Sequence, residues 1–578
     1  MVFKPAAVAG TVPPIPDNIP ISEFMLTEGN GRYPLSKARH PFTCGLTGKT
    51  YSTLEVKERV DYLSRALAKL LGWEPNSGTE WDKTLCVFSL NTIDTLPLAW
   101  ATHSLGGIVS PANAAYSVEE LRHQLLDAKP KALFTCAPLL STALGAASAA
   151  GFPKERIYLI DVLPESGKIP TEYKTLSQLV EAGKSLPKVE KVSWRAGEAA
   201  RRTAFLCYSS GTSGLPKGVM ISHRNVIANV LQIAAFEKSW RDKQKTADGN
   251  YYTDVLLGLL PQSHIYGLVV MCHAGPFRGD QVIVLPKFEL GTYMAAVQNF
   301  KISTLFVVPP IIINMLRSRE FCSQYDFSSA RSLFTGAAPL GKETALDFQK
   351  AYPDVAIRQA YGLTETATVA TATHFDDIVF GSSGWIVPGA EARIVTPNGE
   401  EVTAYDTPGE LWIRSPSVVL GYLNNEKATK ETFTDGWMRT GDEAIIRKSP
   451  KGVEHVYIVD RIKELIKVKG HQVAPAELEA HLLTHPAVVD CAVIAIPDDS
   501  AGEIPKAIVA KSPEAGSNDE ETIKSIIKYV QDHKARHKWL KGGVRFIDAV
   551  PKSPSGKILR RLLRDQEAAM RRQAGAKL

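Results

Sequence analysis

Residues 208–225, YSSGTSGLPKGVMISHRN, bring together groups that can hold a phosphate. Small and hydroxyl-bearing residues let backbone N–H groups and side-chain oxygens turn toward one anion, because no bulky side chain blocks the approach. Lys217 adds a mobile positive charge at the end of this run. The candidate anion-binding residues before it are Ser209, Ser210, Gly211, Thr212, Ser213 and Gly214. The run therefore predicts a phosphate-binding loop.

The spacing in this loop excludes a Walker A motif. Counted from Gly211, that motif would need a glycine at position 216 and a hydroxyl residue at position 218, where the chain has Pro216 and Gly218. The apolar run 203–208 predicts a strand before the loop, and Ser222 with Asn225 predicts the start of a helix after it. The loop is thus expected at the exit of a strand.

The same residues resemble the phosphate loop of the adenylate-forming enzymes, which comprise acyl- and aryl-CoA ligases, luciferases and nonribosomal adenylation domains. The resemblance extends from about residue 30 to residue 565 and follows several further motifs in order. These are 261-PQSHIYGL-268, 332-SLFTGAAPLGKE-343, 359-QAYGLTET-366, the segment ending at 440-TGD-442, 467-KVKGHQVAPAELE-479 and 551-PKSPSGKILRR-561. The motifs HIYGL and KVKGHQVAPAELE resemble the 4-coumarate–CoA ligase branch.

The resemblance implies a site for ATP and Mg²⁺. Glu365 is a hard oxygen ligand suited to Mg²⁺, Tyr361 can stack on adenine, and the carboxylate of Asp442 can accept both ribose hydroxyls. Lys557 is implied as the mobile cation of the adenylation step. The residues implied for ATP and AMP are the loop residues above with Lys217, Ala337, Gln359, Ala360, Tyr361, Thr364, Asp442, Arg461, Lys463 and Lys557.

The resemblance also implies a pocket for a carboxylic acid, with His264 beside the reacting carboxylate and Tyr266 lining the pocket. The candidate lining residues are Ile265, Tyr266, Val269, Val270, Thr335, Gly336, Gly362, Thr368 and Val369. Val270 adds bulk where coumarate ligases place a hydroxyl or a small residue, which disfavours a strictly phenolic acid. An aryl-propenoic acid, an arylacetic acid and a medium-chain acid remain open.

A two-step reaction follows from the resemblance. The acid is first joined to AMP with release of pyrophosphate; a small C-terminal domain then rotates about a hinge at 460–463 and presents residues 467–472 to guide the thiol of CoA. The resemblance implies a catalytic role for Lys467 and Gln472. It implies that Lys469 and Gly470 bind CoA, and a weaker match suggests the same role for Lys287. The chain departs from the coumarate ligase motif at Val468 and His471.

Three alternatives differ in the acceptor or in activity. A stand-alone adenylating enzyme would load a separate carrier protein, a luciferase-like enzyme would oxidise its acyl adenylate, and a silent relative would only bind AMP. The silent alternative is disfavoured because every charged participant is present: Lys217, Glu365, Asp442, Arg461, Lys463 and Lys557.

Helical segments alternate with short apolar runs at 84–91, 132–136, 156–161, 254–260, 281–285 and 304–308, which is typical of parallel sheets covered by helices on both faces. Toward the C-terminus, the runs 490–496 and 543–550 predict strands, and an amphipathic helix is expected around 519–540. Ser52 and Glu55 predict a capping box before a helix that continues through Leu70. The expected fold is α/β. A large N-terminal domain of stacked, mostly parallel sheets, with a small β-rich subdomain, spans residues 1–460, and a small mobile α+β domain spans 461–578.

Composition agrees with a globular protein, with 44% hydrophobic and 22% charged residues among 578. A net charge of +6 is small for this length and argues against a nucleic-acid partner. The seven cysteines contain no C-x-x-C pair and predict free thiols.

The termini predict no signal peptide, and no apolar run is long enough to predict a membrane span. The last residues, Ala576, Lys577 and Leu578, resemble the S-K-L peroxisomal address, which implies a peroxisomal location and the peroxisomal import receptor as a partner.

Overall fold

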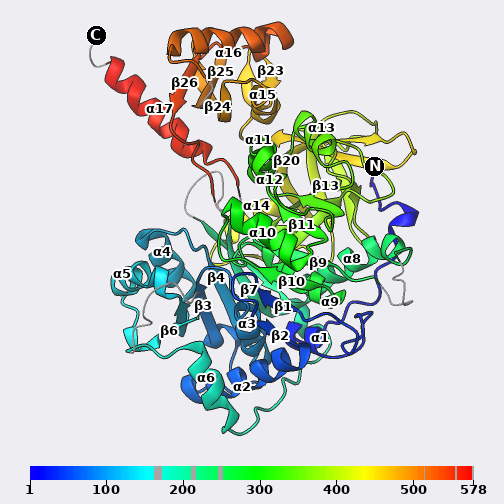
Figure 1. Cartoon of the computed structure of the whole chain (residues 1–578), viewed down its shortest axis with the longest axis vertical. Helices are drawn as coiled ribbons and strands as arrows, with labels where there is room; N and C mark the ends of the chain where they lie inside the picture. Colours follow the sequence, from blue (N-terminus) through cyan, green and yellow to red (C-terminus); the bar gives the residue numbers. More distant parts are fainter. Residues whose placement is uncertain (162–171, 210–215, 245–251, 513–514, 554–555, 576–578) are drawn as a thin grey trace.

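The larger part of the chain is built on two mostly parallel sheets (Figure 1). The computed structural model describes residues 1–161, 172–209, 216–244, 252–512, 515–553 and 556–575. In spatial order, the nine-stranded sheet contains β15 (Trp385–Ile386), β14 (Thr368–Ala372), β13 (Ala356–Leu363), β12 (Ser332–Thr335), β11 (Thr304–Val307), β9 (Val255–Gly258), β10 (Gln281–Val284), β1 (Phe42–Cys44) and β2 (Thr50–Tyr51). Strands β1 and β9 to β13 are parallel.

The second sheet has seven strands. Their order is β18 (Gly421–Tyr422), β8 (Lys217–Ser222), β7 (Thr203–Ser209), β4 (Ile108–Ala112), β3 (Thr84–Phe88), β5 (Ala132–Thr135) and β6 (Ile157–Leu159). The apolar runs predicted as strands are confirmed at β3, β5, β6, β9, β10 and β11, because burial on both faces requires continuous apolar residues. Strand β8, which was not predicted, pairs antiparallel with β7 and separates the phosphate loop from the following helix.

Helices cover these sheets. They are α1 (Ile21–Leu26), α2 (Thr53–Leu71), α3 (Thr95–Ser104), α4 (Val118–Ala128), α5 (Leu140–Ala150), α6 (Leu176–Lys184), α7 (Glu198–Arg201), α8 (His223–Arg241), the π-helix η5 (Tyr266–Ala274), α9 (Gly275–Phe277), α10 (Leu290–Phe300), α11 (Pro309–Arg317), α12 (Arg319–Cys322), α13 (Lys342–Ala351) and α14 (Glu426–Thr432). The predicted capping box forms at Ser52 with Glu55, and the helix start predicted at Ser222 and Asn225 is confirmed, with a capping box of its own.

The predicted β-rich part is a five-stranded sheet of β16 (Glu391–Val395), β17 (Gly409–Arg414), β20 (Trp437–Lys448), β19 (Phe433–Thr434) and β21 (Glu454–Arg461). Strands β20 and β21 are antiparallel, and their register sets Asp442 opposite Arg461. Strand β21 ends at Arg461, inside the predicted hinge segment 460–463. The N–H of Ile462, the next residue, donates to the carbonyl of Gly441.

The C-terminal part has its own sheet, made of β23 (His471–Val473), β22 (Ile466–Val468), β25 (Gly502–Lys511), β24 (Val488–Asp498) and β26 (Val544–Ile547). Its helices are α15 (Pro475–Leu482), α16 (Asp519–His533), the short turn η7 (Arg536–Lys538) and α17 (Arg560–Gly575). Sequence patterns predicted β24, α16 and β26 but missed β22, β23 and β25. The helix expected to reach residue 540 ends at His533.

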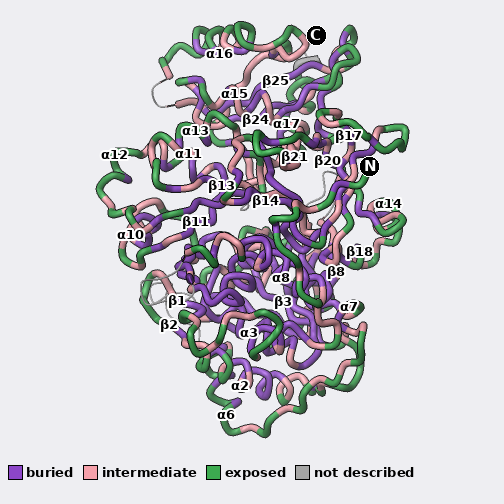
Figure 2. The backbone as a smooth tube through the Cα atoms, turned by 90° about the vertical axis from the view of Figure 1, so that its right-hand side faces the viewer, coloured by how far each residue is buried: buried purple, intermediate pink, exposed green. Residues whose placement is uncertain are grey.

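Buried residues, purple in Figure 2, occur in both parts of the chain, and their apolar side chains form separate cores. The core of the C-terminal part runs from Ile466 to Leu563, whereas the largest core of the preceding part ends at Val456. The parts touch where the guanidinium of Arg317 donates to the carbonyls of Val488 and Val489, at 2.7 and 2.6 Å. Within the described ranges, no helix combines the length and apolarity needed to cross a membrane.

Candidate active site

The stem of the predicted phosphate loop is the β7–β8 hairpin. Ser209 ends β7, Lys217 begins β8, and the two residues pair across the hairpin. The Lys217 ammonium lies 4.8 Å from the centroid of the Tyr422 ring, a cation–π contact that holds this charge at the loop. The predicted loop residues Ser210, Gly211, Thr212, Ser213 and Gly214 lie outside the described residues.

Glu365 faces the same hairpin from the short turn η6 (Thr364–Thr366), which follows β13. Its Oε1 accepts hydrogen bonds from the Ser209 hydroxyl at 3.3 Å and from the Tyr422 hydroxyl at 2.8 Å. Sequence reasoning missed Tyr422, because only the pairing of β18 with β8 brings it here.

This carboxylate fits a Mg²⁺ ion that arrives with a triphosphate. Magnesium in nucleotide sites usually keeps one or two protein carboxylates and takes its other ligands from phosphates and water. No group of three or more His, Cys, Asp or Glu side chains that could hold a metal occurs among the described residues. Glu365 with a neighbouring hydroxyl therefore suits a metal shared with a nucleotide better than a closed protein site.

The turn that carries Glu365 is strained. Thr368 has φ 118° and Ala367 has φ 48°, values that residues with a Cβ rarely adopt. Hydrogen bonds hold the turn, since the Thr366 hydroxyl donates to the carbonyl of Thr368 and the Thr368 hydroxyl donates to the carbonyl of Ile265. Backbone strain of this kind is characteristic of positions that must aim a functional group.

Gly362 makes this turn possible, and its replacement tests the packing. A Cβ at Gly362 would lie 1.5 Å from the carbonyl oxygen of Thr368, so the backbone must move. We expect Gly362→Ala to lower the free energy of unfolding by about 3 kcal/mol in chemical denaturation. Gly516→Ala is the matched control, because a Cβ added there would meet nothing within 4 Å, and it should change stability by less than about 0.5 kcal/mol. Equal stability of the two variants would contradict this account of the turn.

Asp442, the residue predicted to bind the ribose, is almost fully buried. The Tyr361 hydroxyl donates to its Oδ2 at 2.6 Å, and Arg461 Nε lies 3.5 Å from its Oδ1. Burial raises the pKa of Asp442, and the charge of Arg461 opposes that rise. These partners orient the carboxylate.

Lys557 reaches this group from the loop between β26 and α17. The carbonyl and N–H of Lys557 bond to the backbone N–H and the hydroxyl of Ser553, at 2.8 and 3.2 Å. Next to it, a Cβ at Gly556 would meet Val308 at 3.3 Å, so the loop packs closely on the large part of the chain. Burial, and then the positive charge of Arg461, lowers the pKa of Lys557 to about 8, while Glu464, Asp442 and Glu365 oppose the shift.

His264 lies close enough to Lys557 to be affected by its charge. Burial, and then the charge of Lys557, lowers the pKa of His264 to about 4, so the imidazole is neutral near pH 7. Its Nδ1 accepts from the backbone N–H of Tyr266 at 3.3 Å. The structure therefore brings Lys557, Arg461, Asp442, Glu365 and His264 into one electrostatic neighbourhood.

The residues predicted to lie beside the adenine begin directly after β12, which ends at Thr335. Gly336 is buried, and the Tyr266 ring fills the space beside it, 3.5 Å from where a Cβ at this position would lie. Ala337 is exposed in the left-handed region, with φ 66°. Gln359 and Ala360 belong to the adjacent strand β13, and Thr364 opens the η6 turn.

The predicted acid-pocket residues separate into groups. Val270 and Val369 line a cavity of about 20 Å³, together with Ile233, Phe236, Glu237, Arg278, Phe306, Phe334, Ala372 and Val387. Tyr266 packs edge-on against two of these lining residues, Phe306 and Phe334, and its hydroxyl donates to the carbonyl of Phe334. Ile265 and Val269 are buried beside Tyr266. The helix α8 residues were missed because their apolar pattern indicates only a core helix.

The residues predicted to serve CoA lie elsewhere. Lys467 and Gln472 pair across the β22–β23 hairpin, whose tip is Lys469 and Gly470, and all four are exposed. In Figure 1, β23 lies farther from the large part of the chain than α15 does. Helix α15 contacts the start of α13, because a Cβ added at Gly341 would lie 3.0 Å from Ala480. Lys287 is exposed after β10, and Lys463 is exposed just after Arg461.

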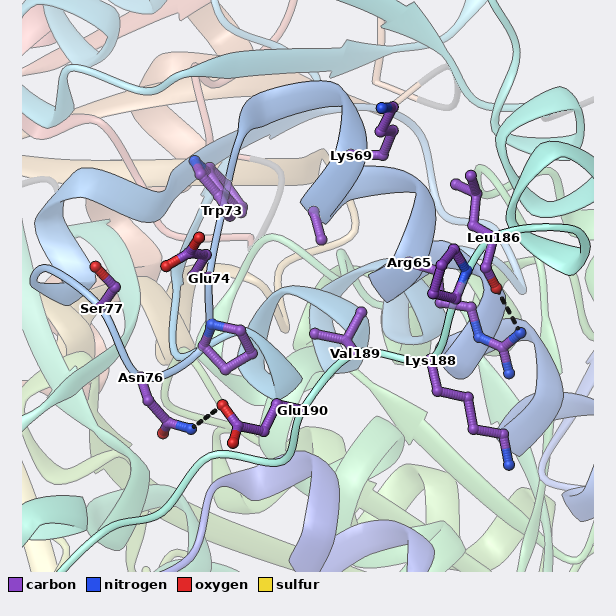
Figure 3. Close-up of a pocket in the computed structure, with 13 residues that line it drawn as sticks. Arg65, Lys69, Trp73, Glu74, Asn76, Ser77, Leu186, Lys188, Val189 and Glu190 are labelled. Atoms are coloured by element: carbon purple, nitrogen blue, oxygen red, sulfur yellow. Dashed lines mark hydrogen bonds between the residues drawn. The ribbon is translucent and has the colours of Figure 1, made fainter.

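A second, surface pocket of about 440 Å³ lies between the end of α2 and the chain after α6 (Figure 3). The Arg65 guanidinium donates to the carbonyl of Leu186, and the Asn76 amide donates to Glu190. None of the residues predicted for ATP, acid or CoA lines this pocket. The size of a pocket therefore does not identify the active site here.

Comparisons with known proteins agree with this geometry. The family model described as AMP-binding enzyme matches residues 35–423, and the model described as AMP-binding enzyme C-terminal domain matches residues 477–557. Both matched ranges contain members of the cluster around Asp442 and Lys557, since Glu365 lies in the first and Lys557 in the second.

Similar proteins match over almost the whole chain. Acyl-CoA ligase easD of Emericella nidulans is 37% identical, covering 98% of this chain and 100% of its own, and acyl-CoA ligase gloD of Glarea lozoyensis is 39% identical, covering 98% and 99%. The crystal structure of the anthranilate CoA ligase AuaEII in complex with anthranoyl-AMP has the same fold, with a TM-score of 0.79 at 22% identity over 96% of this chain and 98% of that one. The chain belongs to the AMP-binding enzyme family, within the adenylate-forming superfamily.

Proposed function

We propose that the protein is an AMP-forming acid–CoA ligase. It activates a carboxylic acid with ATP, releases pyrophosphate, and transfers the acyl group from AMP to the thiol of CoA. The full-length relatives named acyl-CoA ligases support this function. The observation that carries it is the convergence of Lys557, from the C-terminal part, on Asp442, Arg461 and Glu365.

The arrangement provides what the first step requires. The acid and the α-phosphate are both anionic, and a preorganised cation between them lowers the barrier more than a mobile one in water. Lys557 supplies that charge, Lys217 neutralises the outer phosphates, and Asp442 holds the ribose. A Mg²⁺ ion held by Glu365 would neutralise charge on the departing pyrophosphate. His264 stays neutral and leaves room for the acid.

The second step requires another arrangement, because the CoA-binding hairpin lies away from this cluster. We place the domain boundary at Asp460 and the hinge at 460–463, where β21 ends. Rotation there would withdraw Lys557 and bring Lys467, Lys469, Gly470 and Gln472 toward the acyl adenylate. Support comes from the separate cores on either side of this segment.

The acid is proposed to be an aryl or medium-chain acid that does not require a phenolic hydroxyl. Support comes from the apolar and aromatic side chains around Val270 and Val369, which include Phe306 and Phe334. The cavity there has about 20 Å³, room for about one water, and also borders Glu237 and Arg278, so these side chains must move to admit an acid. The deciding experiment measures acid-dependent pyrophosphate release with ATP and Mg²⁺ across aryl, arylacetic and straight-chain acids, with and without CoA. Pyrophosphate together with a CoA thioester supports the ligase. Pyrophosphate without a thioester would instead favour a carrier-loading or luciferase-like enzyme, and neither product would favour a silent relative.

The pH dependence of adenylation tests the role of Lys557. The pKa of Lys557 is lowered from 10.5 to about 8, so the cation is present below that pH and is lost as pH rises through it. We expect kcat/KM for pyrophosphate release, which reports the free enzyme, to fall above about pH 8. Lys557→Arg should remove this limb, because arginine remains charged. If kcat/KM of the arginine variant still falls above the same pH, the fall is caused by the titration of another group.

We also propose that the tripeptide Ala576-Lys577-Leu578 directs the protein to peroxisomes through the import receptor. These residues lie outside the described residues, and their type and order support the proposal. A fluorescent fusion that preserves this C-terminus should localise with a peroxisomal marker, and removal of the tripeptide should disperse it. Unchanged localisation of the truncated fusion would refute the proposal.

A further inference from the structure

The β22–β23 hairpin needs support from other elements to keep its tip in place. Its strands have three residues each, and a hairpin of that length is not stable by itself. Lys469 and Gly470 form the turn, with φ of 48° and 82°, as a two-residue hairpin turn requires. Lys469 N–H donates to the carbonyl of Ala501 at 2.9 Å, which ties one side of the tip to the sheet.

A stacked pair of imidazoles supports the other side. His471 is the first residue after the turn, and its ring lies 4.5 Å from the ring of His537, with an angle of 18° between their planes. His537 belongs to η7, which α15 holds in place, because Glu477 forms ion pairs with Lys534 and Lys538 at 3.2 and 2.6 Å. The pair thus connects the tip to an anchored turn.

We propose that the His471–His537 stack is a positioning device for the second half-reaction: it fixes the turn at Lys469 and Gly470 in the orientation that receives CoA. The inference rests on the proposed ligase function. Lys469 and Gly470 adjoin the stack directly, so loss of the stack changes the direction of the groups predicted to bind CoA, while the cluster around Asp442 is untouched.

The stack should also respond to pH. Lys538 on η7 adds positive charge next to His537, and Glu477 on α15, which pairs with Lys534 and Lys538, is the acid that acts on it. The pKa of His537 is lowered from 6.5 by burial, then by His471 and Lys538, while Glu477 opposes the shift. The folded stack therefore favours neutral His537, and the contact weakens as pH falls below 6.5.

The test measures transfer of the acyl group from preformed acyl adenylate to CoA, with adenylation as the reference for folded enzyme. His537→Ala should raise KM for CoA about three- to tenfold, the range expected for losing one ring pair. His533→Ala is the matched control: the His533 ring at the end of α16 lies 4.8 Å from the tilted ring of Tyr529, not on the hairpin, so this variant should leave KM unchanged. Equal KM values for these two variants would overturn the proposal.

A second variant distinguishes the effect of ring stacking from the effect of histidine protonation. It also tests the proposal if His537→Ala does not fold. The double variant His471→Phe with His537→Phe keeps two rings that can stack and removes the imidazole of His537 that can be protonated. It should retain a KM for CoA near that of the wild type, and its transfer rate relative to the wild type should rise as pH falls below about 6.5. A constant ratio would overturn the pH response. A wild-type enzyme that forms no CoA thioester would instead refute the ligase function.

Discussion

Lys557→Ala should reduce acid-dependent pyrophosphate release by about 10²- to 10³-fold, the cost of removing one preorganised charge from a water-poor site. The loss should appear mainly in kcat, because Lys217 and Asp442 still bind the nucleotide. Transfer from supplied acyl adenylate to CoA should be much less affected, since the proposed hinge motion withdraws Lys557 before that step. Single-turnover assays of each half-reaction separate the two effects.

Lys552→Ala is the control for this variant. Lys552 lies on the same loop, but its ammonium forms an ion pair with Asp490 at 2.7 Å within the C-terminal part. This pair lies outside the cluster around Asp442, so activity should be close to normal. Similar losses in the two variants would show that the loop as a whole matters and that the Lys557 charge does not.

Glu365→Gln should cause a loss of similar size, about 10²- to 10³-fold in adenylation. Glutamine preserves an oxygen that can accept from Ser209 and Tyr422 but removes the negative charge that suits Mg²⁺. We therefore expect the Mg²⁺ concentration for half-maximal pyrophosphate release to rise along with the loss in rate. A titration of rate against Mg²⁺ at constant ATP measures both.

Two further variants interpret this result. Tyr422→Phe removes one hydrogen bond to Glu365 and leaves its charge, so a much smaller loss is expected. Glu343→Gln makes the same substitution at an exposed position in the first turn of α13 and should have no effect on the Mg²⁺ dependence. If Glu365→Gln lowers the rate without changing the Mg²⁺ requirement, its role is to orient the phosphate hairpin.

Several features could be predicted from the chain because they depend on nearby residues. Continuous apolar runs predicted the buried parallel strands, and the capping box at Ser52 and the polar residues Ser222 and Asn225 predicted where α2 and α8 begin. Strand β8 was missed because a short apolar segment next to glycines has no distinctive period. The hairpin strands β22 and β23 were missed for the same reason, since three residues show no clear alternation.

The sequence by itself determined the family resemblance, the α/β class and the charged groups of the candidate site, because these depend on residue types at fixed spacing. Only the tertiary structure decided which groups meet. The pairing of β18 with β8 brings Tyr422 to Glu365, and the docked C-terminal part brings Lys557 near Asp442. The stack of His471 on His537 joins two residues that lie far apart in the chain, a contact that no local pattern encodes because its energy comes from packing of distant elements.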